Sequence, residues 1–305
     1  MMSLQREHVL DQEPVEAVEP YRPWAELAHR FATNRLALVG LVVIGALVVV
    51  SGVYFGLELT GGAWPYDPAA TDVASRFLGP SLAHPLGTDH LGRDVLARML
   101  FGARISLMVG FVAVGIAITI GIIVGATAGH FAGWVDNVLM RMVDIVICFP
   151  RFFLILTVVA LVKPSLWNII IVLGLTGWTG TARLIRGEIL SLRERDFIQA
   201  ARAVGAGAPR IILRHLIPNA LTPVLVSATL GVAGAILTEA GLSFLGFGVQ
   251  PPQPTWGNIL TEGRLYIFDA WWLTVFPGLA ILLTVLAFNL VGEALRDAWD
   301  PRLKV

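Results

Sequence analysis

The sequence alternates long apolar runs with short polar segments. Six runs carry few charges and are long enough, at about 1.5 Å of rise per helical residue, to cross a hydrocarbon core of about 30 Å. The fourth is the shortest, because its apolar stretch ends near Thr181 and must extend toward Gly187 to span. The pattern predicts transmembrane helices at residues 36–57, 105–129, 137–162, 168–187, 218–240 and 271–293.

Polar segments flank and connect these runs. Residues 1–22 are acidic and contain prolines, which is typical of a disordered tail. Residues 23–35 place Trp24, Leu27 and Phe31 on one helical face beside arginines, and so predict an amphipathic helix lying on anionic lipid, with a solvated helix or an unstructured tail as the alternative. The other polar segments are 58–104, with a short helix, 193–217, 241–270 and a tail at 296–305.

One of the spans carries glycines at helical spacing. Gly121, Gly125 and Gly129 recur every four residues in the second apolar run. Because glycine has no side chain, a neighbouring helix can approach that face closely.

Composition supports an all-α membrane protein. Hydrophobic residues make up 56% of the chain and charged residues only 14%, whereas about 25% is usual in soluble domains. Of the 22 Lys and Arg residues, 15 lie in segments that share a side with the N-terminus and six in segments on the other side. The positive-inside rule therefore places both termini and 193–217 in the cytoplasm, and 58–104 and 241–270 outside. A formal net charge of +0 provides no bulk field to recruit nucleic acid.

The polar stretch 193–217 predicts two short helices joined by a glycine corner. Asp196 and Gln199 have the spacing of a capping box. Gly205 can adopt the left-handed conformation that ends a helix, and Pro209 suits the first turn of the next one.

Several kinds of chemistry are missing from the sequence. The two lysines, Lys163 and Lys304, do not follow a glycine-rich turn, so the chain has no P-loop for ATP. It also lacks a Gly-x-Ser-x-Gly elbow and a His-Glu-x-x-His pair, which argues against an intramembrane enzyme. The single cysteine, Cys148, excludes an internal disulfide and a cysteine-based metal cluster.

Ionisable residues within the predicted spans are the candidates for a translocation path, because charges at membrane depth are costly and usually functional. They are Asp144 and Arg151 in the third span and Glu239 at the end of the fifth. Asp144 can pair with Arg141, three residues away. Arg151 lies two turns further along the same expected helix, and we expect it to face a central aqueous path or a partner subunit.

The segment 58–104 contains His84, Asp89, His90 and Asp94 within eleven residues. This spacing matches no established set of metal ligands. Nearby glycines instead favour a turn, with Asp89 or Asp94 capping the helix that enters the second span. We expect no metal or cofactor here.

Five stretches resemble one family, the permease subunits of ABC importers, and within it the DppC/OppC type for dipeptides and oligopeptides. Gln199-Ala-Ala-x-x-x-Gly205, followed by Ile217-Pro218, resembles the family's EAA loop. The others are His84-Pro-Leu-Gly-Thr-Asp89 with Gly102-Ala-Arg-Ile-Ser106, Gly241-Leu-Ser-Phe-Leu-Gly246 with Trp256-Gly257, Phe288-Asn-Leu-x-Gly292, and Leu295-Arg-Asp-Ala-Trp-Asp-Pro301.

The resemblance implies the membrane domain of a type I ABC importer in the inner membrane of a prokaryote. Its implied partners are a homologous second permease, two cytoplasmic ATPases that bind ATP and Mg²⁺, and an extracytoplasmic substrate-binding protein. The loop 193–217 would dock on one ATPase, with apolar residues including Ile198 and Val204 filling its groove. The ATPase-contacting residues that the resemblance implies are Asp196, Phe197, Gln199, Ala200, Ala201, Arg202, Gly205, Ala206, His215 and Pro218.

Three residues depart from the family pattern, and the cargo stays open. Gln199 replaces a glutamate, His215 replaces an isoleucine of the general loop, and Arg151 is unusual after Phe-Pro. The expected cargo is a dipeptide or oligopeptide, with nickel complexes, glutathione or oligosaccharides as alternatives. A stand-alone facilitator or channel is the alternative from another class.

Overall fold

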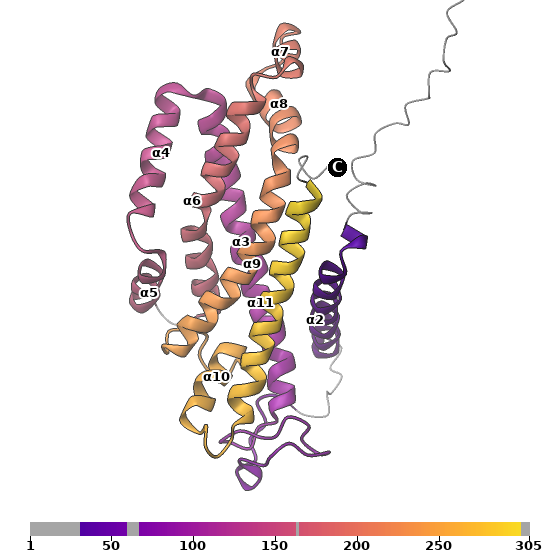
Figure 1. The fold of residues 1–305 in the computed structure, drawn as a ribbon. Coiled ribbons are helices and arrows are strands. Elements are labelled where there is room, and N and C mark those ends of the chain that lie inside the picture. The colour runs from indigo at the N-terminus through magenta and orange to yellow at the C-terminus, as the bar shows by residue number, and fades with distance from the viewer. Residues whose placement is uncertain (1–30, 60–66, 163–164, 300–305) are drawn as a thin grey trace, which may run out of the picture.

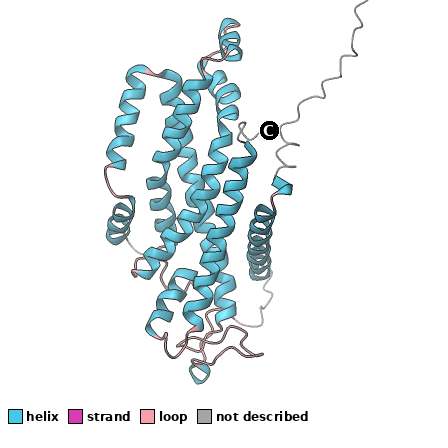
Figure 2. Cartoon of the chain, in the orientation of Figure 1, coloured by secondary structure: helices cyan, strands magenta, loops and turns pink. Residues whose placement is uncertain are grey.

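The computed structural model describes residues 31–59, 67–162 and 165–299. The expected tail at 1–22, residues 23–30 of the helix expected at 23–35, and residues 300–305 of the tail expected at 296–305 lie outside these residues. The described chain is a bundle of long helices that run up and down beside one another (Figure 1). Within the described residues, Figure 2 shows helices and loops and no strand.

Among the described residues, five helices are long and apolar enough to cross a membrane. Each follows one of the apolar runs, since a helix satisfies all of its backbone hydrogen bonds internally in lipid. They are α2 (Arg35–Leu59), α3 (Val95–Phe131), α6 (Leu166–Leu192), α9 (Ile217–Phe244) and α11 (Trp272–Trp299).

The expected span at 137–162 takes a different form. It is a pair of helices, α4 (Gly133–Ile147) and α5 (Arg151–Leu161), bent by 79° at the intervening residues. Pro150 explains the break, because proline lacks an N–H and disfavours a helical conformation in the residue before it. Counted as one broken span, the pair makes the sixth crossing.

Helix α3 starts ten residues before the expected boundary at 105. Asp94 is its N-cap, and its Oδ1 accepts a hydrogen bond from the Ala97 amide at 2.8 Å. This confirms that Asp94 caps the helix leading into the second span. The short helix expected within 58–104 is a 3-10 turn, η1 (Val73–Ser75), which the Asp72 side chain caps.

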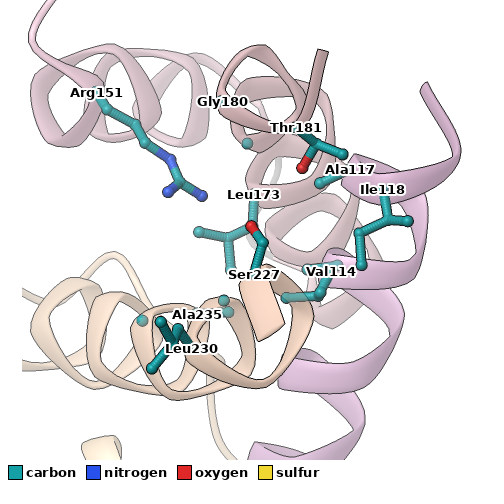
Figure 3. A pocket seen from close by; sticks show the side chains of 14 residues that line it. Val114, Ala117, Ile118, Arg151, Leu173, Gly180, Thr181, Ser227, Leu230 and Ala235 are labelled. Carbon is teal, nitrogen blue, oxygen red and sulfur yellow. The ribbon is translucent and has the colours of Figure 1, made fainter. Parts of the chain in front are cut away.

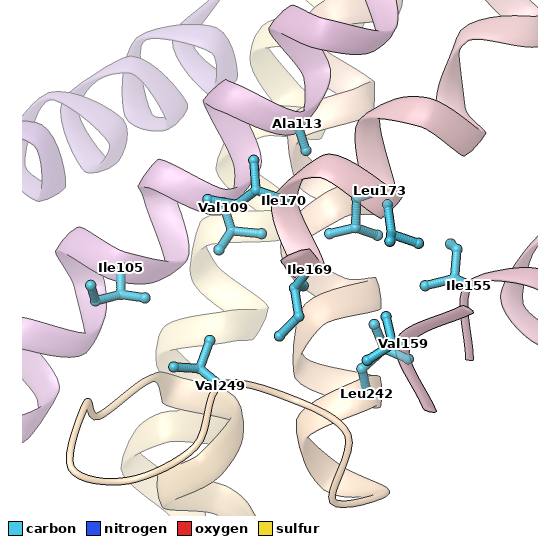
Figure 4. Close-up of a cluster of buried hydrophobic side chains, with 11 residues drawn as sticks. Ile105, Val109, Ala113, Ile155, Val159, Ile169, Ile170, Leu173, Leu242 and Val249 are labelled. Carbon is cyan, nitrogen blue, oxygen red and sulfur yellow. The ribbon is translucent and has the colours of Figure 1, made fainter. Parts of the chain in front are cut away.

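The centre of the bundle is the contact between α3 and α6. A Cβ added at Gly129 would lie 3.0 Å from the Ile189 Cβ, and one at Gly121 would lie 3.0 Å from the Trp178 carbonyl oxygen. The predicted close approach on the glycine face is therefore confirmed. Figure 4 shows the adjoining apolar cluster, to which Ile105 and Val109 of α3 and Ile169 of α6 belong.

The two ends of the bundle differ. One end carries α7 (Asp196–Ala203) and α8 (Ala208–Ile211), and it is also where α2 begins and α11 finishes (Figure 1). The other end carries α10 (Trp256–Leu265) and the loops around residues 67–94. Which end faces the cytoplasm stays a prediction from the loop charges.

Candidate functional site

The polar stretch between α6 and α9 forms a protrusion at one end of the bundle. Helix α7 lies at its tip in Figure 1, beyond the ends of the long helices. Helix α8 follows it after a short corner. The predicted order of helix, glycine corner and helix is therefore present.

Gly205 makes the corner possible. Its φ is +81°, in the left-handed region that glycine adopts without a steric penalty. Two hydrogen bonds close the end of α7, from the Gly205 amide to the Arg202 carbonyl at 2.9 Å and from the Ala206 amide to the Ala201 carbonyl at 3.0 Å. This pair defines a Schellman motif, so the predicted role of Gly205 in ending the helix is confirmed.

The predicted capping box is wrong. Asp196 is the first helical residue, and Arg195 occupies the N-cap position without a side-chain hydrogen bond. The Gln199 side chain therefore has no capping partner, and its Nε2 instead donates to the Arg193 carbonyl at 3.3 Å. The carboxylate of Asp196 still lies in the first turn, where the helix dipole favours a negative charge.

The protrusion is anchored by a single apolar side chain of α7. Ile198 is completely buried in a cluster with Ile189, Ile211 and Leu216. The sequence predicted that Ile198 would fill a groove on another protein, and this is wrong, because the residue holds α7 against its own chain. Helix α7 presents Phe197 to the surroundings instead.

The remaining predicted loop residues lie mostly on the surface. Phe197 is 43% exposed, and Val204, next to the corner, is 85% exposed. The side chains at the surface are those of Asp196, Phe197, Gln199, Ala200, Arg202 and Pro218, and the half-buried ones are those of Ala201, Ala206 and His215.

A single helical stretch connects the protrusion with the bundle. Helix α8 continues through a π-helical turn, η2 (Ile212–Leu216), directly into α9. His215 lies in this turn, and its carbonyl oxygen accepts a hydrogen bond from Asn219 Nδ2 at 2.6 Å. Helices α8 and α9 are therefore joined without a break in the helical backbone.

Ion pairs join α4 to α6 near the same end. Arg186 forms two hydrogen bonds with Asp136, of 2.5 and 2.6 Å. Asp144 pairs with Arg183 of α6 at 2.6 Å and more loosely with Arg141 at 3.6 Å. The predicted pairing of Asp144 with Arg141 is present, but the shorter contact comes from a residue 39 positions away.

A cavity of about 320 Å³ lies between α3, α5, α6 and α9. Among the described residues that line it, Arg151 alone is charged, and Figure 3 shows this side chain extending from α5 into the space between α6 and α9. Because the chain breaks before Arg151, this residue does not continue the helix of Asp144 as the sequence suggested. Asp144 and Glu239, the other two candidates for a path, do not line the cavity.

Glu239 is completely buried near the other end of the bundle. Its Oε1 accepts hydrogen bonds from Ser243 at 2.7 Å and from Thr255 at 3.1 Å. These contacts join α9 to the cap of α10, so the surroundings of Glu239 are those of a packing contact. Its role in a path stays a prediction.

The end opposite α7 is held by a charge network that the sequence did not predict. Arg98 donates to both carboxylate oxygens of Glu262, at 2.6 and 2.9 Å, and also to Asp89. Arg93 Nε donates to Asp89 at 2.6 Å, and Arg93 Nη2 donates to Glu262 at 3.0 Å. Glu262 lies more than 160 positions from both arginines, so no local pattern pointed to it.

The same network determines the ionisation of Asp89. Burial opposes the charged carboxylate, but Arg98 and Arg93 outweigh it, aided by the Leu91 and Arg93 amides, and keep the pKa of Asp89 below its usual value. Asp89, His90 and Glu262 offer atoms within 4.8 Å of one another, as a metal site requires. Both carboxylates already pair with arginines, so the arrangement fits a charge network better than a cation site.

Two family models match the chain. Residues 117–305 match the binding-protein-dependent transport system inner membrane component. Residues 22–80 match the N-terminal TM domain of oligopeptide transport permease C.

Curated relatives match over nearly the whole length. A dipeptide transport system permease protein, DppC of Alkalihalophilus pseudofirmus, is 42% identical over 92% of this chain and 91% of its own. A putative peptide transport system permease protein of Brucella suis is 43% identical over 91% of this chain and 92% of its own.

One solved structure resembles the fold. It is described as inward-facing conformations of the MetNI methionine ABC transporter, and the matching chain has a TM-score of 0.52 at 19% identity. The match covers 65% of this chain and 95% of that chain. At this identity the likeness concerns the fold alone.

Proposed function

This chain belongs to the binding-protein-dependent transport system inner membrane component family, and on that premise we propose that it carries dipeptides or oligopeptides inward across the membrane. It is an ABC transporter permease of the DppC/OppC type with the fold of a type I importer membrane domain. In the proposed mechanism, separate ATPase subunits hydrolyse ATP and this chain alternates between outward-open and inward-open conformations.

The protruding corner of α7 and α8 is the observation that carries the coupling proposal. It exposes Phe197 and Val204 beside arginines, while Ile198 fixes its base to the bundle. A short, anchored helix with an exposed aromatic side chain suits insertion into a groove on another protein. Under this proposal the α7 end faces the cytoplasm, as the loop charges predict.

A second permease chain is the proposed neighbour of α4 and α5. Helix α4 packs against α3 and α6, and α5 packs against α6. The pair exposes the apolar side chains of Trp134, Met142, Ile145 and Phe153, and exposed apolar side chains on a transport subunit suit a protein interface within the membrane. The extracytoplasmic binding protein is assigned to the end that carries α10.

The assignment of peptides as cargo rests on the names of the relatives. Both curated relatives are named for peptide or dipeptide transport, and they align over more than nine tenths of the chain. Within this family the binding protein delivers the cargo, so it sets much of the selectivity.

Reconstitution tests the proposal. The chain is placed in proteoliposomes with the second permease, the two ATPases and the peptide-loaded binding protein. We expect ATP hydrolysis and peptide uptake to rise together, and both to require this chain. Uptake that persists with hydrolysis-deficient ATPases would identify a facilitator instead and reject the proposal.

A further inference from the structure

The guanidinium of Arg151 has no counter-charge within the described part of the chain. No hydrogen bond or ion pair there involves this side chain, whereas Arg183 and Arg186 of the neighbouring helix α6 do have acidic partners. A charged group at membrane depth is costly unless it meets a partner or water. The cavity is where such a partner has room.

The other two acidic candidates for a path make their contacts elsewhere. Asp144 pairs with Arg183, and the Oε1 of Glu239 accepts hydrogen bonds from Ser243 and Thr255. Neither lines the cavity, and the described residues that do line it include no carboxylate. A negative charge that matches Arg151 would therefore come from another molecule.

The lining leaves space for the guanidinium and offers further donors. A Cβ at Gly177 would lie 3.0 Å from Arg151 Nη2, so the guanidinium packs directly against this glycine. On the facing wall, Gly231 and Gly234 of α9 add no bulk. The hydroxyls of Thr181 and Ser227 face the same space in Figure 3, and no hydrogen bond recorded for the described residues uses them.

We propose that this cavity binds the carboxylate of the cargo, the C-terminal carboxylate of a transported peptide, through the guanidinium of Arg151. Arginine suits this role because its planar fork donates two parallel hydrogen bonds to a carboxylate. A volume of about 320 Å³ is small for a ligand pocket and fits the end of a peptide. Ser227 and Thr181 then donate to the same end. The inference rests on the proposed function.

The test compares a peptide with its amide. Trialanine and trialanine amide differ only in the terminal negative charge, and each is supplied at a concentration that saturates the binding protein. Uptake is measured in proteoliposomes containing the complete importer, with either the wild-type chain, Arg151→Gln or Arg151→Lys. Arg104→Gln is the matched control, because Arg104 is an α3 arginine that stacks on Phe55, away from the cavity.

We expect Arg151→Gln to lower uptake of trialanine by about tenfold or more, the loss typical of a charge-assisted hydrogen bond. In the same variant, uptake of trialanine amide stays within about twofold of the wild-type rate. Arg151→Lys recovers part of the lost trialanine uptake. Arg104→Gln leaves the ratio of trialanine uptake to amide uptake at its wild-type value. An equal loss for both peptides would assign Arg151 to a carboxylate of the partner permease and overturn the inference, as would no loss for either. A wild-type importer that transports neither peptide contradicts the proposed function itself.

Discussion

Replacing Gly205 tests whether the corner between α7 and α8 transmits force. At φ +81° a leucine is strained, whereas its Cβ would meet nothing within 4 Å, so the strain comes from the backbone conformation rather than from crowding of the Cβ. The left-handed conformation costs a residue with a Cβ about 1–2 kcal/mol. This corresponds to a loss of about 5- to 30-fold in the population of the native corner relative to alternatives.

The assay separates the corner from the bundle. In Gly205→Leu we expect the thermal unfolding midpoint in detergent to stay near the wild-type value, because the buried cluster around Ile198 is unchanged. Stimulation of the ATPases by loaded binding protein, and peptide uptake, fall several-fold. Gly205→Asn is the matched control, since asparagine tolerates the left-handed region and should retain most of both activities. Wild-type coupling in Gly205→Leu would refute the reasoning.

Two further substitutions test the packing that supports this geometry. Asp89→Asn leaves the buried Arg93 and Arg98 sharing one carboxylate, that of Glu262, and we expect a loss of about 3 kcal/mol in the free energy of unfolding, measured by denaturation in micelles. The pKa of Asp89 is lower in the folded protein than its unfolded value near 3.8. The stability that Asp89 contributes is therefore fully present above the unfolded pKa and is lost as the pH falls through the folded pKa. A melting temperature that does not decrease in this acidic range would contradict the argument. Gly125→Leu forces a Cβ to 2.9 Å from that of Ile185, and overpacking should cost about 1–3 kcal/mol. Gly115→Leu, on the same helix but in open space, should melt close to wild type, and equal losses would count against the packing argument.

Features that depend on neighbouring residues were predicted well from the sequence. The apolar runs predicted the long helices, and the glycine spacing predicted the close contact of α3 with α6. Gly205 and Pro209 marked the corner and the start of α8, because their backbone preferences are strong and local. The predicted capping box was wrong because Arg195, and not Asp196, occupies the N-cap position of α7. A shift of one residue places the Asp196 carboxylate inside the first helical turn.

Features that depend on distant residues were not predicted. The ion pairs of Arg98 with Glu262 and of Asp144 with Arg183 join positions 164 and 39 apart, and the sequence offered only the near partners. For the same reason the sequence showed Glu239 only as an ionisable residue within a span, whereas in the structure Thr255, the N-cap of α10, donates a hydrogen bond to its carboxylate. Pro150 alone predicts a break in the helix. The 79° bend, and the cavity that Arg151 lines, depend on how α5 packs against α6.

The positions of the protrusion and the cavity suggest how one could act on the other. Helix α6 enters the protrusion and α9 leaves it through the π-helical turn, and both helices line the cavity, at Gly177 and Thr181 on one side and at Ser227 on the other. An ATPase groove that binds α7 would therefore be connected to both of these cavity walls, α6 and α9, through continuous helices. Under the proposed function, closure of the ATPases would move α9 against α6 and change the space around Arg151. The carboxylate would then be held in one conformation and released in the other, which is what differential binding to two states requires of a transported ligand.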